Sequence, residues 1–118
     1  MKTFKLHLIR HGMTAGNLQG LYIGSGTDLP LCDEGRAQLA DLKERFAYPQ
    51  VDTVFSSPLL RAVETANILF PGAAHQFTVH DLREAGFGKF EGRPVKDLVH
   101  DEDFKKWITP GSGYLPEG

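Results

Sequence analysis

A histidine that follows the apolar run at residues 4–9 is set among residues that suit phosphate chemistry. The local sequence is Arg10-His11-Gly12-Met13. A neutral imidazole can attack phosphorus directly, because its unprotonated nitrogen needs no prior loss of a proton. The planar guanidinium of arginine stays charged and can bind two phosphate oxygens at once. Glycine leaves room for the backbone to approach the phosphate. These residue types predict a phosphate site.

The charge of a phosphomonoester calls for further groups besides Arg10 and His11. Such an ester carries about two negative charges near neutral pH. A protein that attacks its phosphorus must neutralise this charge and supply a proton to the leaving oxygen. Arg61, within the run Ser-Ser-Pro-Leu-Leu-Arg-Ala-Val-Glu-Thr-Ala at residues 56–66, is the second candidate cation. A nearby carboxyl group is expected to be the proton donor.

The elements that position these residues can be predicted from apolar periodicity and turn residues. Strands are expected at residues 4–9, 51–55 and 76–79, and long loops at 12–31 and 82–94. Helices are expected at residues 34–48 and at 95–108. A further helix is expected to begin after a cap at Ser57, with Pro58 in its first turn. This order favours parallel strands joined by right-handed crossovers, and therefore an α/β fold, a three-layer sandwich with a mainly parallel sheet. Ligands bind at the carboxyl ends of such strands, so His11 and Arg61 are expected to face one crevice.

Composition limits the classes of function. The chain has 118 residues, enough for one small domain, and a net charge of −2, which gives no general attraction to nucleic acid or anionic membranes. The single cysteine, Cys32, excludes an internal disulfide and suits a reducing compartment. The amino terminus reaches Arg10 too soon for a signal peptide, and no stretch has the length of a membrane span. We therefore expect a cytoplasmic protein.

Taken in order, the motifs resemble those of the histidine phosphatase superfamily, the phosphoglycerate-mutase-like fold. Besides the runs at 10–13 and 56–66, the resemblance is carried by Thr14, Asn17, residues 28–31 (Asp-Leu-Pro-Leu) with Gly35, residues 82–84 (Leu-Arg-Glu) and residues 87–92 (Phe-Gly-Lys-Phe-Glu-Gly). It extends from Leu6 to about Gly118.

The resemblance implies specific roles for several residues. His11 is expected to become transiently phosphorylated, and Asn17 to bind phosphate oxygens together with Arg10 and Arg61. Glu84 is expected to protonate the leaving alkoxide and then to accept a proton from the water that attacks the phosphohistidine. The resemblance implies no metal and no cofactor. His7 and His11 are four residues apart, but on a strand this spacing does not make the zinc pair that it makes on a helix.

Three departures from the family pattern affect these expectations. The second catalytic histidine of the family has no counterpart before Gly118, so residues 1–118 are expected to be the N-terminal part of a single histidine phosphatase domain, truncated before that histidine. By itself this chain is expected to be weak or inactive, because losing one preorganised donor costs roughly 10²–10³ in rate. Cys32 stands where a Thr or Ser usually opens the first helix, which weakens the cap unless Asp33 replaces it. Met13 stands where a polar residue is common.

Three functions remain open. A phosphomonoesterase is favoured, because the loop at residues 16–28 lacks the tryptophans of the mutases and looks more like bacterial broad-specificity or α-ribazole phosphatases. The alternatives are a phosphoglycerate mutase, which transfers a phosphoryl group, and a non-catalytic fragment. The expected partners are a small phosphorylated substrate or inorganic phosphate, with no nucleic acid and no membrane. A homodimer is also expected, through the sheet edge that residues 4–9 would expose.

Overall fold

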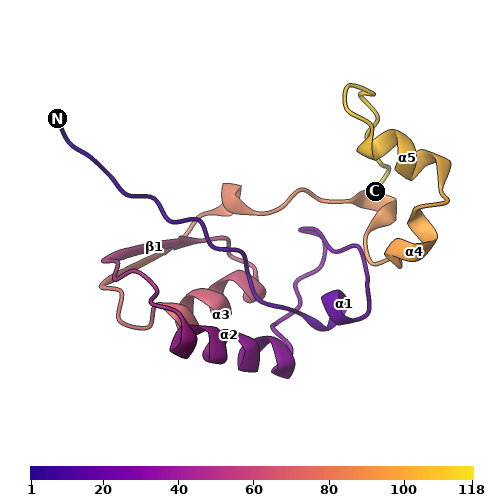
Figure 1. The fold of residues 1–118 in the computed structure, drawn as a ribbon. Helices are drawn as coiled ribbons and strands as arrows, with labels where there is room; N and C mark the ends of the chain where they lie inside the picture. Colours follow the sequence, from indigo (N-terminus) through magenta and orange to yellow (C-terminus); the bar gives the residue numbers. More distant parts are fainter.

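The computed structural model describes all 118 residues as a mixed α/β structure with one small parallel sheet (Figure 1). The strands β1 (Thr53–Ser56) and β2 (His75–Thr78) pair in parallel, with Thr53 opposite His75 and Ser56 opposite Thr78. The main helices are α2 (Asp33–Arg45) and α3 (Leu60–Leu69). Helix α3 packs against both β1 and α2. The predicted α/β class with parallel pairing is therefore confirmed.

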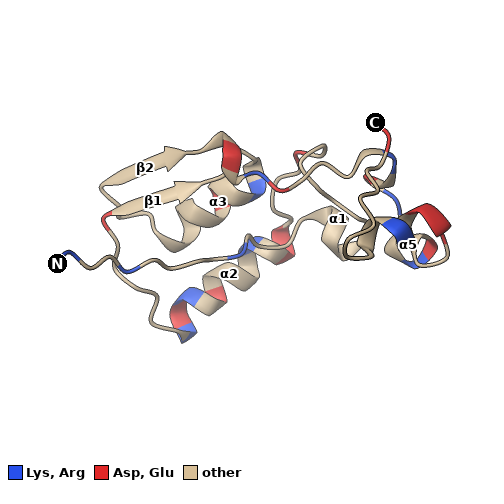
Figure 2. Cartoon of the chain, turned by 90° about the horizontal axis from the view of Figure 1, so that it is seen from above, with Lys and Arg blue, Asp and Glu red and all other residues tan.

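Shorter elements make up the rest of the chain. They are α1 (Ala15–Leu18), the 3₁₀ turns η1 (His80–Leu82) and η2 (Gly88–Phe90), α4 (Val95–Leu98) and α5 (Glu102–Ile108). None of the helices combines the length and apolar character that a membrane crossing requires. Figure 2 shows acidic and basic residues interspersed along α2, as the small net charge suggests.

Two separate apolar clusters form the core. One joins Leu31, Leu39 of α2 and Leu69 of α3. The other is mainly aromatic and lies around α4 and α5, with the buried residues Phe87, Phe90, Leu98 and Phe104, and with Tyr22, Trp107 and Tyr114 packed against them. Leu39 and Leu69 of the first cluster line the same open hollow as Arg10, His11 and Asn17.

The prediction of a strand at residues 4–9 is wrong. The segment is an extended coil with no hydrogen-bonded neighbour, shown in indigo in Figure 1. The side chains of Phe4, Leu6 and Leu8 are more than four-fifths exposed, at 86%, 81% and 86%. Alternating apolar residues predict a pleated backbone, but a strand also requires a partner, and no other segment of these 118 residues pairs with this one.

Helix α3 begins two residues later than predicted, and Ser57 does not cap it. The helix starts at Leu60 after the cap position Leu59, which makes no side-chain capping bond. Instead the backbone N–H of Leu60 donates to Oδ1 of Asp28 at 2.7 Å. A carboxylate from a distant loop thus satisfies an amide that helix geometry leaves without an internal partner.

The single helix predicted at residues 95–108 is two helices, α4 and α5. The chain breaks between them because Asp101 caps α5, accepting hydrogen bonds from the N–H groups of Asp103 at 2.9 Å and Phe104 at 3.0 Å. The Phe104 amide is the main reason that the pKa of Asp101 is lowered, and Arg93 contributes. Aspartate competes with helix continuation through such local bonds.

Helix α2 opens at Cys32, which caps the helix itself. Its Sγ accepts a hydrogen bond from the N–H of Gly35 at 3.3 Å and lies 3.4 Å from the Met13 carbonyl oxygen, to which it donates. Asp33 does not replace it as the cap. The helix ends at Arg45, three residues earlier than predicted.

Candidate functional site

The first residue of the candidate site, Arg61, is an almost completely buried cation on α3. Its side chain is only 3% exposed. Nη1 donates to the carbonyl oxygen of Thr27 at 2.8 Å, and Nη2 donates to that of Gly24 at 3.2 Å. Nη2 also lies 3.6 Å from Oε2 of Glu84, whose side chain is half exposed. A buried charge is tolerated only when it is paired and hydrogen-bonded, and these three oxygens meet that need.

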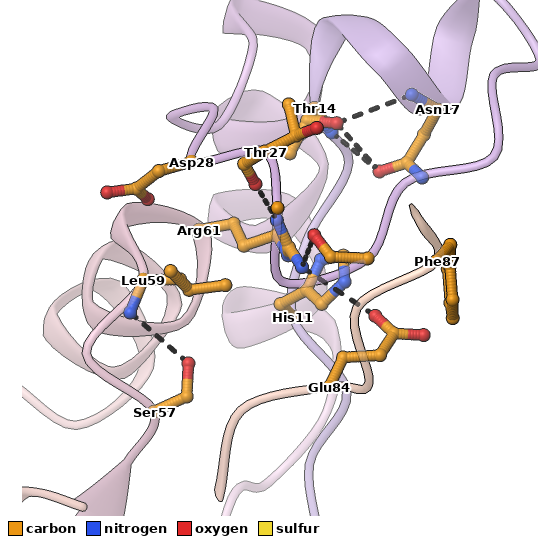
Figure 3. A network of polar contacts seen from close by, with 12 residues as sticks. His11, Thr14, Asn17, Thr27, Asp28, Ser57, Leu59, Arg61, Glu84 and Phe87 are labelled. Atoms are coloured by element: carbon orange, nitrogen blue, oxygen red, sulfur yellow. Dashed lines mark hydrogen bonds and ion pairs between the residues drawn. The ribbon is translucent and has the colours of Figure 1, made fainter. Parts of the chain in front are cut away.

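His11 lies beside this ion pair and is partly buried (Figure 3). Its Nδ1 is 2.6 Å from the carbonyl oxygen of Gly12. Because a carbonyl oxygen can only accept a hydrogen bond, Nδ1 carries the proton in the neutral ring and Nε2 keeps its lone pair. The geometry therefore leaves Nε2 as the ring nitrogen with a free lone pair.

Thr65 connects the histidine segment to the arginine. Its hydroxyl accepts a hydrogen bond from the N–H of Gly12 at 2.9 Å and donates to the carbonyl oxygen of Arg61 at 2.7 Å. Both bonds are buried. This side chain fixes the backbone next to His11 against the first turns of α3, so the two segments cannot shift independently.

The glycine at position 12 also lies close against the apolar core. A Cβ atom on Gly12 would lie 2.8 Å from Cδ1 of Leu39, a buried residue of α2. The missing side chain thus leaves room for Leu39, and a larger residue here would require the Leu39 side chain to shift. Its predicted part in the approach of phosphate stays a prediction.

Asn17 and Arg10 are placed differently from Arg61. Asn17 is exposed and forms a capping box with Thr14 at the start of α1: its Oδ1 accepts from the N–H of Thr14 at 2.9 Å, and its backbone N–H donates to Oγ1 of Thr14 at 3.3 Å. The Thr14 hydroxyl also donates to Oδ1 at 3.1 Å. The side-chain N–H groups of Asn17 have no protein partner. Arg10 is exposed on the extended segment and makes no ion pair. Both residues line one open hollow together with His11.

The structure thus brings the five predicted site residues into two adjoining groups. Arg10, His11 and Asn17 share the hollow, and Arg61 and Glu84 form an ion pair beside the histidine (Figure 3). No three His, Cys, Asp or Glu side chains come together as metal ligands.

Two residues with important contacts were not singled out from the sequence. Thr65 and Glu91 both lie inside the motif runs, at 56–66 and 87–92, but nothing in the sequence alone assigned them a contact. The more distant hydrogen-bond partner of Thr65 is 53 residues away, and the most distant partner of Glu91 is 67 residues away. Periodicity and capping patterns describe only near neighbours, so neither role could be read from them.

Comparisons with known proteins show the family of the chain. The pattern of the histidine phosphatase superfamily (branch 1) matches residues 6–118. A fructose-2,6-bisphosphatase TIGAR B from Danio rerio is 39% identical, covering 99% of this chain and 49% of the relative. An adenosylcobalamin/alpha-ribazole phosphatase from Salmonella typhimurium is 34% identical, covering 95% of this chain and 56% of the relative.

A mutase and a solved structure extend the comparison. A 2,3-bisphosphoglycerate-dependent phosphoglycerate mutase from Bifidobacterium longum is 34% identical, covering 89% of this chain and 46% of the relative. The crystal structure of TTHB049 from Thermus thermophilus superposes with a TM-score of 0.69 at 36% identity, covering 93% of this chain and 59% of that one. The chain spans about half the length of the curated relatives that it matches. With nearly its whole length matched, this chain belongs to the histidine phosphatase superfamily.

Proposed function

We propose that the protein hydrolyses phosphomonoesters through a phosphohistidine on His11. The observation that carries the proposal is the Arg61–Glu84 ion pair, 3.6 Å between Nη2 and Oε2, beside a histidine whose Nε2 is left with its lone pair. A cation for the phosphate, a nucleophile and a carboxyl group for the leaving oxygen are the three groups that the reaction needs.

Phosphate binding is proposed to use three donors of different types. Arg61 contributes the N–H groups that its carbonyl partners leave free, and Arg10 contributes an unpaired guanidinium. Asn17 contributes its amide N–H groups, because its Oδ1 is occupied by Thr14. Substrate phosphate then competes with Glu84 for Arg61.

The proposed reaction has two steps. Nε2 of His11 attacks phosphorus, the bond to the ester oxygen breaks, and Glu84 gives its proton to the leaving alkoxide. Water then attacks the phosphohistidine, Glu84 takes a proton from that water, and inorganic phosphate leaves with the histidine regenerated. No bond in this sequence requires a metal or an organic cofactor.

A phosphoglycerate mutase is the second candidate, because a curated mutase is among the relatives of the chain. The absence of tryptophan from residues 16–28 favours the phosphatase. A phosphatase releases inorganic phosphate from a generic aryl phosphate, whereas a mutase does so poorly and requires a bisphosphorylated primer. The third candidate, a non-catalytic fragment, is distinguished by having neither activity.

The test measures turnover of an aryl phosphate and acid-labile phosphoryl labelling of the protein. We expect residues 1–118 alone to turn over an aryl phosphate very slowly, because the second histidine that the resemblance implies has no counterpart among them. His11→Ala should abolish both turnover and acid-labile phosphoryl labelling. The matched control is His100→Ala, which changes an exposed histidine. Near-normal turnover by the His11→Ala protein would show that the assignment is wrong.

A further inference from the structure

The carboxylate of Glu91 collects four hydrogen bonds and has no cation as a partner. Oε2 accepts from the N–H of Gly24 at 2.7 Å and from the hydroxyl of Thr27 at 2.8 Å. Oε1 accepts from the N–H of Gly26 at 3.3 Å and from that of Phe87 at 3.4 Å. Three of these donors belong to residues 24–27, and bonds to an ionised acceptor are the strong ones.

The same loop holds the guanidinium of Arg61. Gly24 and Thr27 direct their donors to Glu91 and their carbonyl oxygens to Arg61. Gly24 and Thr27 therefore connect the buried guanidinium of Arg61 to the carboxylate of Glu91, although these two side chains do not contact each other. Hydrogen bonds in such a chain polarise one another, so each end strengthens the other.

Close packing leaves this loop little freedom. A Cβ atom on Gly24 would lie 2.4 Å from the carbonyl oxygen of Ala85, and one on Gly26 would lie 3.0 Å from Oε1 of Glu91. Ala85 follows the Glu84 that pairs with Arg61, and its carbonyl oxygen accepts from the N–H of Ser25 at 3.2 Å. The segment that carries the proposed acid is thus tied to the same loop.

We infer that Glu91 is a positioning residue for phosphate binding, which holds the Arg61 guanidinium in place through the loop at residues 24–27. This inference rests on the proposed function. Glu91 does not itself contact phosphate: its charge is already taken up by loop donors. It acts on the orientation of the Arg61 side chain and on its position relative to Glu84.

The direction in which phosphate affinity changes when Glu91 is replaced distinguishes a positioning role from a through-space effect of its charge. Removing a negative charge near an anion site strengthens anion binding if the charge acts only through space. Removing Glu91 weakens binding if the carboxylate acts through Arg61. Glu91→Gln offers one carbonyl oxygen in place of two acceptors and turns an N–H₂ toward loop donors, so the loop loses its anchor.

The experiment measures binding of inorganic phosphate to the protein by calorimetry, and its turnover of an aryl phosphate. We expect Glu91→Gln to weaken phosphate binding about tenfold, the cost of a misplaced charge-assisted contact. The control Glu44→Gln removes a carboxylate from the exposed face of α2 and should leave binding unchanged. Glu91→Asp keeps the charge but shortens the reach, and should also weaken binding, which a purely electrostatic effect would not do.

A double-mutant cycle tests whether Glu91 acts through the arginine. In an Arg61→Lys background, Glu91→Gln should have little further effect on phosphate binding, because lysine cannot bridge the two loop carbonyls. Unchanged or stronger phosphate binding by both Glu91 variants, or full additivity with Arg61→Lys, would overturn the inference. If phosphohistidine still forms on His11 in that case, the proposed function stands and only the positioning role fails. If wild-type protein neither binds phosphate nor forms phosphohistidine, both fail together.

Discussion

Replacing Thr65 with valine should both destabilise the protein and loosen the candidate site. Valine has nearly the shape of threonine, so packing is kept while the hydroxyl is lost. The buried N–H of Gly12 then has no acceptor, and the carbonyl of Arg61 loses a donor. A buried donor left unsatisfied costs about 1–3 kcal/mol, so we expect a loss of about 2 kcal/mol in the free energy of unfolding. A domain of this size should melt roughly 8 °C lower.

The functional consequence follows from what Thr65 connects. Without its hydroxyl, the backbone beside His11 is no longer fixed to α3, and phosphate affinity should fall along with stability. The control is Thr65→Ser, which keeps both hydrogen bonds and loses only a methyl group, so phosphate affinity should be close to that of wild type. Thermal unfolding followed by circular dichroism, with phosphate titration of each variant, measures both effects. A Thr65→Val protein that is as stable as wild type and binds phosphate equally well would refute this reasoning.

Three other predictions concern charge, proton transfer and assembly. Arg10→Ala and Arg61→Lys should each weaken inhibition by vanadate by about an order of magnitude, because each loses a charge-assisted contact. The control Arg45→Ala, on the outer face of α2, should leave inhibition unchanged. If Arg10→Ala or Arg61→Lys also left inhibition unchanged, the arginine replaced would not belong to the phosphate site. Glu84→Gln should slow substrates with poor leaving groups far more than aryl phosphates, and equal slowing of both denies Glu84 the role of acid. We propose that the 118-residue chain dimerises through residues 4–9, whose apolar side chains are exposed. Sedimentation at micromolar concentration should show a dimer. A monomer with full activity would contradict the proposal.

Regular elements could be predicted from the sequence where local pattern determines them. The strands expected at 51–55 and 76–79 are observed at Thr53–Ser56 and His75–Thr78, and the helix expected at 34–48 is observed at Asp33–Arg45. The two strands are short, and the helix shows a clear apolar face, so near neighbours carry most of the information.

The errors arise where a distant partner, or the lack of one, decides the outcome. Residues 4–9 have the pattern of a strand but no neighbour to pair with, and the start of α3 depends on Asp28, which lies 32 residues earlier than the amide it caps. The candidate site divides in the same way. His11 and Arg61 could be nominated by residue type, whereas the connecting roles of Thr65 and Glu91 exist only because the fold brings distant segments together.

The most direct test of the account is the identity of the phosphorylated atom. The protein, labelled with ¹⁵N-histidine, would be mixed with an aryl phosphate, quenched in base and studied by ¹⁵N and ³¹P NMR. Because Nδ1 of His11 is held by the Gly12 carbonyl at 2.6 Å, we predict one acid-labile phosphoryl group on Nε2 of His11, absent from His11→Ala. A phosphoryl group on Nδ1 or on another residue, or turnover without any phosphohistidine, would contradict the account.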